Sequence, residues 1–528
     1  MTNKYIDRVK LSNFKKFTEF DVFLNRDMNV LIGDNGSGKS TLVLAIELVL
    51  GGNQNRIESL GVDNLINIQA IEKFKAFDAQ HRIFENLPIC YLEVYLNEQN
   101  NFDLNGANNS LTQLTDGLRL ELSPRVDLKG EIDQVLSNDN SAFPFEFYQI
   151  KFNTFQGQGY TGYSRHMKCL LIDNTQISNE YATRSYIKNV YETHSKVDER
   201  SKLRFGYRQI KSEFSQTALT GINESMSEGH SFELRHGARS TLENDLTIAE
   251  NGIQVENMGK GRQCFVRTEF ALSKGSSNNE PDVVLLEEPE NHLSHGSMNQ
   301  LIKRINDSNG SQLLVTTHSS LISARLDLNK AIFLSEQSNQ PIFLKDLRPD
   351  TAKFFSKAPI TNILEFVLSS KVLLVEGAAE FILLAPLYKN QTGTDILESD
   401  VHMASVGGLS FIRYLEIASL LEIKTAVITD NDGNFEENIT KKYTDFSQAA
   451  NILIRADCDP ESTTFENSFY NANKDICDEL FTDRVRSNTV LQYMLANKAE
   501  VAYQLLLQKA DELIAPDYIQ EAIEWISV

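Results

Sequence analysis

Two groups of carboxylates follow apolar, strand-like runs in the C-terminal third of the chain. The run KVLLVE ends at Glu376, and Glu380 lies four residues later on an expected helix. Further along, the run TAVITDND ends in Asp430 and Asp432. The carboxyl ends of parallel strands meet at one edge of a sheet, so we expect these side chains to converge there. Converging carboxylates repel one another unless a cation lies between them.

Such a cluster predicts a site for Mg²⁺ or Mn²⁺, because both ions prefer oxygen ligands. Phosphodiester hydrolysis is the chemistry that uses it, often with a pair of metal ions. Each carboxylate alone could be a helix cap or a turn residue, since D-x-D-G is common in loops. The ordered pair of motifs, VEG-x-x-E and then TDND, favours the metal site.

A second group of residues predicts a nucleotide site near the N-terminus. The sequence GDNGSGKS follows an apolar run and precedes helix-compatible residues, which is the order of a phosphate-binding loop. Glycines let backbone N–H groups surround the phosphates, and the helix N-terminus adds its positive dipole. Lys39 would reach the β- and γ-phosphates, and the Ser40 hydroxyl would ligate Mg²⁺. The alternative is a glycine-rich turn that binds nothing.

An acidic strand end completes such a site in ATPases. The run DVVLLEEPE supplies Glu287, expected near the Mg²⁺, and Glu288, expected to orient the attacking water. A further strand-like run ends in TTHS, whose His318 can reach the γ-phosphate; taken alone, it would be a satisfied loop residue. The residues expected to hold ATP are Gly33, Asn35, Gly36, Gly38, Lys39, Ser40, Thr41, Glu287 and His318.

These two sites require at least two folded units of an α/β protein. The length of 528 residues favours about two to four domains. We predict an ATPase domain formed by residues 1–177 and 251–345, and a second domain at 371–528. Residues 346–370 are the expected linker. Residues 178–250 are an expected helical insertion, because the chain between the glycine loop and the acidic strand is too long for one loop.

A basic stretch lies inside the insertion. Residues 183–211 contain eight basic and three acidic side chains, a net charge of 8 − 3 = +5. The basic ones are Arg184, Lys188, Lys196, Arg200, Lys202, Arg204, Arg208 and Lys211. This run is either a solvated helical face, or a pair of helices that forms a dimer, or a DNA contact.

The composition excludes several classes of protein. With 51 basic and 72 acidic side chains, the net charge of −21 excludes a protein that coats DNA through bulk positive charge. It does not exclude an enzyme with a local basic groove. We find no apolar run of the length of a signal peptide or a membrane helix, and the five cysteines are scattered. We therefore expect a cytoplasmic protein without a membrane partner.

The glycine loop, the EEPE sequence and the TTHS sequence together resemble the ABC-type ATPase heads of the structural-maintenance, RecF and Rad50 group. The opening segment KLSNFKKF also looks like the first-strand motif of those heads. In that family two heads sandwich ATP, and a signature loop of one head touches the γ-phosphate held by the other. The candidate here is NMGKGRQ at 257–263, which departs from the LSGGQ pattern of transporters.

The VEG-x-x-E and TDND motifs resemble the Toprim domain shared by topoisomerases, primases and certain nucleases. An ABC-type head followed by Toprim is similar to the OLD (overcoming lysogenization defect) family of ATP-dependent endonucleases. The resemblance implies a head with a helical insertion, followed by a Rossmann-like Toprim domain. It also implies that Glu466, in TFENSF, is a ligand of a second metal ion. Lys498 would stabilise the charge of the phosphorane.

The resemblance implies an ATP-regulated, divalent-metal-dependent DNA endonuclease or nickase. In that function Glu376, Asp430 and Asp432 would bind the catalytic metal ion, and Glu380 and Glu466 would complete a two-metal site. It further implies a homodimer or larger assembly in antiphage defence, with a helicase-like partner or a retron reverse transcriptase and its RNA–DNA hybrid. One alternative is a DNA-repair or chromosome-organising ATPase whose Toprim domain only binds. Another is the ATPase of a transporter.

Overall fold

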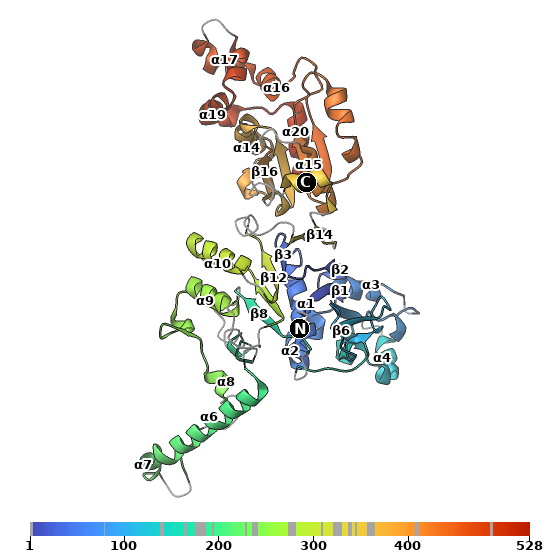
Figure 1. The fold of residues 1–528 in the computed structure, drawn as a ribbon. Coiled ribbons are helices and arrows are strands. Elements are labelled where there is room, and N and C mark those ends of the chain that lie inside the picture. The colour runs from blue at the N-terminus through green and yellow to red at the C-terminus, as the bar shows by residue number, and fades with distance from the viewer. Residues whose placement is uncertain are drawn as a thin grey trace. The chain divides into compact units, whose positions relative to one another are not determined.

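The structure is a computed structural model of the 528-residue chain. It describes residues 4–78, 80–137, 142–162, 166–174, 186–188, 190–192, 195–226, 230–234, 241–272, 281–307, 310–319, 330–335, 340–343, 346–355, 365–406, 411–485 and 489–528. The chain divides into two compact units, shown in Figure 1. The first unit comprises Met1–Leu31 and Gly38–Leu326, and the second comprises Ile32–Ser37 and Asp327–Val528.

An antiparallel sheet forms one part of the first unit. Its strands stand in the order β2-β1-β4-β6-β5, and β7 pairs with β6. Their bounds are β1 Ile6–Phe14, β2 Phe17–Phe23, β4 Cys90–Leu96, β5 Asn105–Gly106, β6 Thr115–Pro124 and β7 Tyr148–Thr154. Apolar side chains of β1, such as Val9 and Leu11, are fully buried, so this face of the sheet forms part of the core.

Apolar strands of the same unit stand in the order β3-β12-β11-β8. Their bounds are β3 Met28–Ile32, β12 Gln312–Thr317, β11 Val283–Glu287 and β8 Cys169–Asp173. Strand β11 pairs in parallel with β12 and with β8. Every residue of β3, β11 and β12 is buried, as expected for strands covered on both faces. Helix α1 (Lys39–Gly51) packs on β8, β11 and β12.

The remaining helices of the first unit are α2 Gln54–Leu60, α3 Ile68–Lys75, α4 Lys129–Leu136, α6 Val197–Thr217, α7 Thr220–Asn223, α8 Leu242–Asp245, α9 Lys260–Leu272 and α10 His295–Asp307. A short antiparallel pair, β9 Ala249–Glu250 and β10 Ile253–Gln254, precedes α9. Among the described residues, no helix combines the length and the apolar character that a membrane crossing requires.

Helix α6 carries most of the basic stretch predicted at 183–211. None of its 21 residues is buried, and Figure 1 shows it extending away from the sheets of its unit. Two of its basic side chains are paired with acids of α8: Arg204 with Glu243, and Lys211 with Asp245, whose Nζ and Oδ2 atoms lie 3.7 Å apart. Arg184 lies outside the described residues. The solvated or dimer-forming face and the DNA contact both stay predictions for this segment.

A parallel sheet organises the second unit. Its strands stand in the order β16-β15-β17-β18, with bounds β15 Lys371–Val375, β16 Val401–Ser405, β17 Lys424–Ile428 and β18 Ile452–Arg455. The helices of this unit are α12 Pro349–Phe355, α14 Ala378–Thr392, α15 Phe411–Leu421, α16 Phe465–Ala472, α17 Lys474–Phe481, α18 Val490–Ala496, α19 Lys498–Lys509 and α20 Asp517–Ser527. An antiparallel hairpin, β13 Ala331–Phe333 and β14 Ile342–Phe343, precedes them.

The core of this second unit lies between the parallel sheet and the C-terminal helices. Phe469, Phe481 and Ile523 are fully buried there, together with Leu373 of β15. The mixed α/β architecture predicted from the sequence is confirmed. The predicted domain limits at 177, 250, 345 and 370 stay predictions, and residues 356–364 of the expected linker lie outside the described residues.

Candidate functional site

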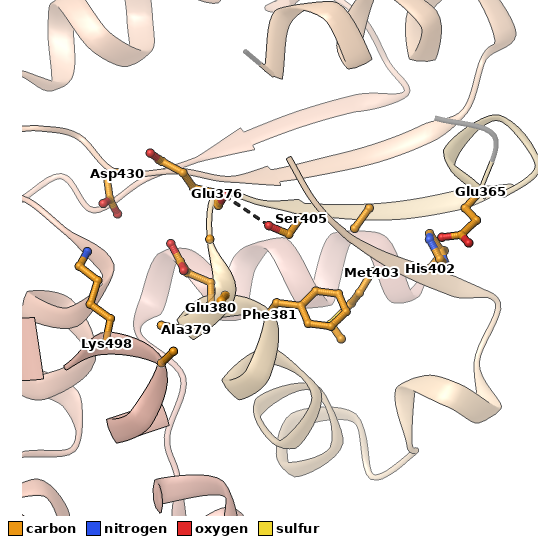
Figure 2. Close-up of a pocket in the computed structure, with 14 residues that line it drawn as sticks. Glu365, Glu376, Ala379, Glu380, Phe381, His402, Met403, Ser405, Asp430 and Lys498 are labelled. Atoms are coloured by element: carbon orange, nitrogen blue, oxygen red, sulfur yellow. Dashed lines mark hydrogen bonds between the residues drawn. The ribbon is translucent and has the colours of Figure 1, made fainter. Parts of the chain in front are cut away.

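A pocket of about 760 Å³ opens at the carboxyl edge of the parallel sheet in the second unit. Glu376 directly follows β15 and Asp430 follows β17, and these strands are parallel neighbours, so their ends meet. Glu380 enters the pocket from the first turn of α14, and Lys498 enters it from the start of α19 (Figure 2). The structure therefore brings together three of the predicted metal ligands and the lysine predicted to stabilise the phosphorane charge.

Burial and like charge both act on the carboxylates of this pocket. Burial raises the pKa of Asp430 to about 7, and the neighbouring charge of Glu376 adds to this effect. Burial also raises the pKa of Glu380 above its ordinary value, and the charges of Glu466 and Glu376 contribute. Buried carboxylates with other carboxylates close by show such shifts.

Glu466 and Lys498 form an ion pair beside these carboxylates. Glu466 is 4% exposed in the first turn of α16, and its Oε2 accepts a hydrogen bond of 2.9 Å from the Lys498 Nζ. Burial lowers the pKa of Lys498, but the hydrogen bond and the charge of Glu466 outweigh burial and raise the pKa overall. The Glu466 Oε1 is buried and has no hydrogen-bond partner among the described residues. Such an atom is costly to bury unless a further group binds it.

The donor set fits a divalent cation. Glu376, Glu380 and Asp430 offer hard oxygen ligands, and the orphaned Oε1 of Glu466 adds another. Within the described ranges, no three acidic, histidine or cysteine side chains already form a ready-made metal cluster. Asp432 departs from the prediction because it is exposed and does not line the pocket. Its backbone has a φ of 49°, in the left-handed region.

Asn431 holds the loop that carries Asp430. Its side chain is 1% exposed, and its Nδ2 donates to the carbonyls of Asp457, Asp459 and Ser462 at 2.8, 3.1 and 3.1 Å. Its Oδ1 accepts a hydrogen bond of 2.7 Å from the backbone N–H two residues on. Asn431 was not predicted from the sequence, because the middle position of a D-x-D motif looks like a spacer between two ligands. The available signal was the Asn-x-Gly pattern of an Asx turn.

We expect Asn431→Ala to weaken Mn²⁺ binding by roughly 10- to 100-fold, the usual cost of losing a residue that orients a metal ligand. Titration calorimetry or electron paramagnetic resonance of the purified chain measures this directly. Asn390→Ala is the matched control, because its Nδ2 also donates to two backbone carbonyls, those of Ala510 and Leu513, outside the pocket. Wild-type Mn²⁺ affinity in Asn431→Ala would contradict the positioning role.

The metal-free protein should lose stability as the pH rises through about 7. The folded state raises the pKa of Asp430 to about 7, so the folded state keeps a proton that the unfolded chain has released. The resulting stabilisation is complete below the ordinary aspartate pKa and is lost as the pH rises through the folded value. Thermal melts in chelator between pH 5.5 and 8.5 check this, and Mg²⁺ should restore more stability at the higher pH. Asp430→Asn should make the melting temperature of the metal-free protein depend less on pH. An unchanged pH dependence in that variant would refute the role of Asp430.

The predicted phosphate-binding loop lies between β3 and α1. Gly36 and Gly38 have φ values of 79° and 102°, which favour glycine. A Cβ atom at Gly38 would lie 2.3 Å from the ring of Phe17. The first turn of α1 contains Lys39, which is 6% exposed, and holds no acidic side chain that would compete with a phosphate. Gly33 and Asn35 lie in the loop, and Ser40 and Thr41 lie in the first turn of α1.

We expect Gly38→Ala to lower the affinity for ATP at least tenfold and to lower Tm by roughly 2–8 °C, because a left-handed alanine costs about 1–2 kcal/mol before any overlap with Phe17. Titration with a fluorescent ATP analogue and a thermal melt measure the two effects. Gly51→Ala is the matched control, because a Cβ atom there meets nothing within 4 Å. Equal ATP binding by both variants would show that Gly38 is dispensable.

Glu287 ends β11 beside the first turn of α1. It is 8% exposed, and the Ser40 hydroxyl forms a hydrogen bond with it. Burial raises the pKa of Glu287 to about 7; the charges of Asp173 and Glu288 add to this, and Lys39 opposes it. Asp173 ends β8 in register with Glu287. Asp173 was not predicted from the sequence, because its only signal is an acid at the end of the run CLLID.

Glu288 and His318 lie close together at the ends of β11 and β12. The His318 Nδ1 lies 3.5 Å from the Glu288 Oε1, and the Asn291 Nδ2 donates to the Glu288 Oε2 at 2.9 Å. Glu288 has a φ of 44°, a strained conformation of the kind found at functional sites. Glu290, which had no assigned role, is 8% exposed, and its Oε1 accepts hydrogen bonds from the Thr317 hydroxyl and the His318 N–H. It therefore fixes the loop that carries His318.

Two family models match this chain, one in each of its two parts. The RecF/RecN/SMC N terminal domain family matches residues 5–340, and the TOPRIM domain of overcoming lysogenization defect protein-like proteins matches residues 367–432. The chain is 25% identical over 197 residues to the Old nuclease of Escherichia phage P2, a match that covers 34% of this chain and 33% of that protein. It is 37% identical over 49 residues to the DNA double-strand break repair Rad50 ATPase of Thermoplasma acidophilum, covering 9% of this chain and 6% of that one. These matches span a third or less of either relative.

Among solved structures, the chain resembles an SmcHead bound to the C-winged helix domain of ScpA. The identity is 14% and the TM-score is 0.36, and the match covers 64% of this chain and 97% of that one.

Proposed function

Because the chain belongs to the RecF/RecN/SMC N-terminal domain family and carries an OLD-like Toprim domain, we propose that it is an ATP-regulated, divalent-metal-dependent DNA endonuclease or nickase. The resemblance to OLD proteins predicted from the motifs is confirmed by these matches and by the likeness to the phage Old nuclease. The observation that carries the proposal is the pocket in which Glu376, Glu380, Asp430 and Lys498 meet.

In the proposed reaction the carboxylates hold the metal ions. Glu376 and Asp430 would bind the catalytic ion, and Glu380 and Glu466 would bind a second one. Asp432, which the motif also assigns to the catalytic ion, is exposed and does not line the pocket. A bound Mg²⁺ or Mn²⁺ supplies a Lewis acid and lowers the pKa of a bound water. Lys498 offsets the negative charge that develops on the phosphorane, since its ammonium group lies at the edge of the same pocket.

We propose that the ATPase part binds ATP and controls cutting. Lys39 and the loop glycines would hold the phosphates, and Ser40 and Glu287 would hold the Mg²⁺ that accompanies ATP. Glu288 would orient the attacking water, and His318 would reach the γ-phosphate. The contact between Ser40 and Glu287 and the 3.5 Å approach of Glu288 and His318 support this assignment.

We further propose a cytoplasmic homodimer or larger assembly in antiphage defence. The partner would be a helicase-like protein, or a retron reverse transcriptase with its RNA–DNA hybrid. None of the five cysteines, all of which lie among the described residues, forms a disulfide, which is typical of proteins in a reducing compartment. A dimer would allow two heads to enclose ATP, as the resemblance to ABC-type heads implies.

Plasmid cleavage tests the proposed function. Supercoiled DNA is incubated with the purified chain and Mn²⁺ or Mg²⁺, with and without ATP, and nicked and linear products are resolved on a gel. We expect cutting that needs the metal, stops in chelator and changes with ATP. If no combination of metal and nucleotide produces cutting, the Toprim domain only binds and the alternative of a repair ATPase takes its place.

A further inference from the structure

The pocket of the second unit extends well beyond its acidic end. Its volume of about 760 Å³ is typical of a site for an organic group. Metal ions would fill only a small part of this volume, because the ligands of a metal ion lie within about 2.6 Å of it. The larger side chains in the rest of the lining are Phe381, His402, Met403 and Glu365, none of which belongs to the predicted metal site. A second ligand of different chemistry is therefore expected beside the metal ions.

Phe381 forms an aromatic wall of this second part. It follows Glu380 in α14 and is 41% exposed, so its ring is unusually open to solvent for a phenylalanine. Met403 of β16 lines the same pocket and is half-buried. Figure 2 shows the Phe381 ring and the Met403 side chain between Glu380 on one side and His402 on the other. Aromatic faces and thioethers are surfaces on which flat ring systems stack.

His402 and Glu365 supply polar groups at the far end of the pocket. Burial lowers the pKa of His402, and the charge of Glu365 opposes this effect. The imidazole is therefore mostly neutral at neutral pH, with one donor and one acceptor nitrogen. An aromatic wall with hydrogen-bonding groups at its end matches the face and the edge of a nucleobase.

We propose that this part of the pocket binds one unstacked nucleobase next to the phosphate that is cut. The substrate would then be DNA that is single-stranded or locally unpaired at the cut. A base inside a duplex stacks on its neighbours and pairs with its partner, so it cannot also lie on Phe381. This inference rests on the proposed nuclease function, and it adds the class of substrate.

The first test combines a protein variant with a substrate variant. Oligonucleotides with a mapped cut carry either the normal base or an abasic nucleotide on each side of that cut. Loss of the base at one of the two positions should lower kcat/KM of the wild-type chain roughly 5- to 150-fold, the range for one base stacked on an aromatic side chain. Phe381→Ala should show a loss of similar size with the normal base, and no further loss with the abasic one.

Three controls separate stacking from damage. Phe381→Trp should keep most of the activity, because it preserves the aromatic face. Tyr503→Ala removes another exposed aromatic side chain of the same unit, outside the pocket, and should cut like the wild type. Mn²⁺ binding by Phe381→Ala should stay at the wild-type level, which shows that the metal site is intact.

The second test varies the pairing of the substrate. The wild-type chain should cut a site inside an unpaired bubble at least roughly tenfold faster than the same site in a full duplex, because unstacking the base costs a few kcal/mol there. Equal rates on the two substrates, or a full abasic penalty in Phe381→Ala, would overturn the base-binding proposal. If Asp430→Ala abolishes cutting, but the cutting rate of the wild type does not depend on the flanking bases, the base-binding proposal alone is overturned. Absence of metal-dependent cutting by the wild type overturns the nuclease function as well.

Discussion

Asp430→Ala should lower metal-dependent DNA cutting by roughly a thousandfold or more, the effect of removing a group that acts mainly on the transition state. Asp430 lies at the end of β17, next to the end of β15 that carries Glu376. Burial has already raised its pKa to about 7, so its surroundings favour either a proton or a metal ion on this carboxylate. Without it, the catalytic ion loses a ligand at the centre of the acidic group.

A more conservative variant makes this result decisive. The Asp430 Oδ1 accepts a hydrogen bond of 2.8 Å from the Phe465 N–H, and the amide oxygen of Asp430→Asn can keep that bond. Asp430→Asn should therefore keep the fold and still lose nearly all cutting. Glu398→Gln removes an exposed carboxylate outside the pocket and should cut normally. Equal plasmid cutting by the wild type and Asp430→Ala would end the nuclease assignment.

Lys39→Ala should weaken ATP binding by roughly a hundredfold or more, because one charge-assisted contact with phosphate oxygens contributes several kcal/mol in a buried setting. Lys39 is 6% exposed in the first turn of α1, so its ammonium group is poorly screened by water. Fluorescence titration with an ATP analogue measures the loss. Lys75→Ala, which removes an exposed lysine of α3, is the control and should bind ATP normally.

The same variant also tests the regulatory role of ATP. If ATP controls cutting through this site, Lys39→Ala should cut plasmid at one rate whether or not ATP is present. The metal pocket is untouched, so the variant should still bind Mn²⁺. An ATP response of wild-type size in Lys39→Ala would mean that the nucleotide acts elsewhere.

Local sequence patterns predicted much of the fold and part of the candidate site. The order of strand, glycine loop and helix around Lys39 depends on neighbouring residues, so the sequence alone could place it. The strands that end at Glu376 and Asp430 are short apolar runs, and parallel pairing brings their ends together without any further information.

Contacts between distant segments and unusual backbone conformations could not be predicted from the sequence. The Asx-turn pattern at Asn431 is local, but the contacts of its Nδ2 with carbonyls of the loop at 457–462 join segments that no local pattern pairs. Glu466 and Lys498 were named through family resemblance, and their ion pair joins positions 32 residues apart. Asp432 was expected among the metal ligands, but its left-handed backbone and exposure keep it off the pocket wall.

The ion pair of Glu466 and Lys498 makes the lysine a resident counterion of the acidic pocket. Its Nζ occupies one oxygen of Glu466 while the other oxygen stays without a partner. Glu466 would hold a metal ion through the oxygen that has no partner, and Lys498 would then be needed less to balance the charge of Glu466. Lys498 would be available to the phosphate of the substrate. The lysine would thus serve as a counterion before the pocket is filled and as a phosphate contact afterwards, so the carboxylates would never be without a positive charge beside them.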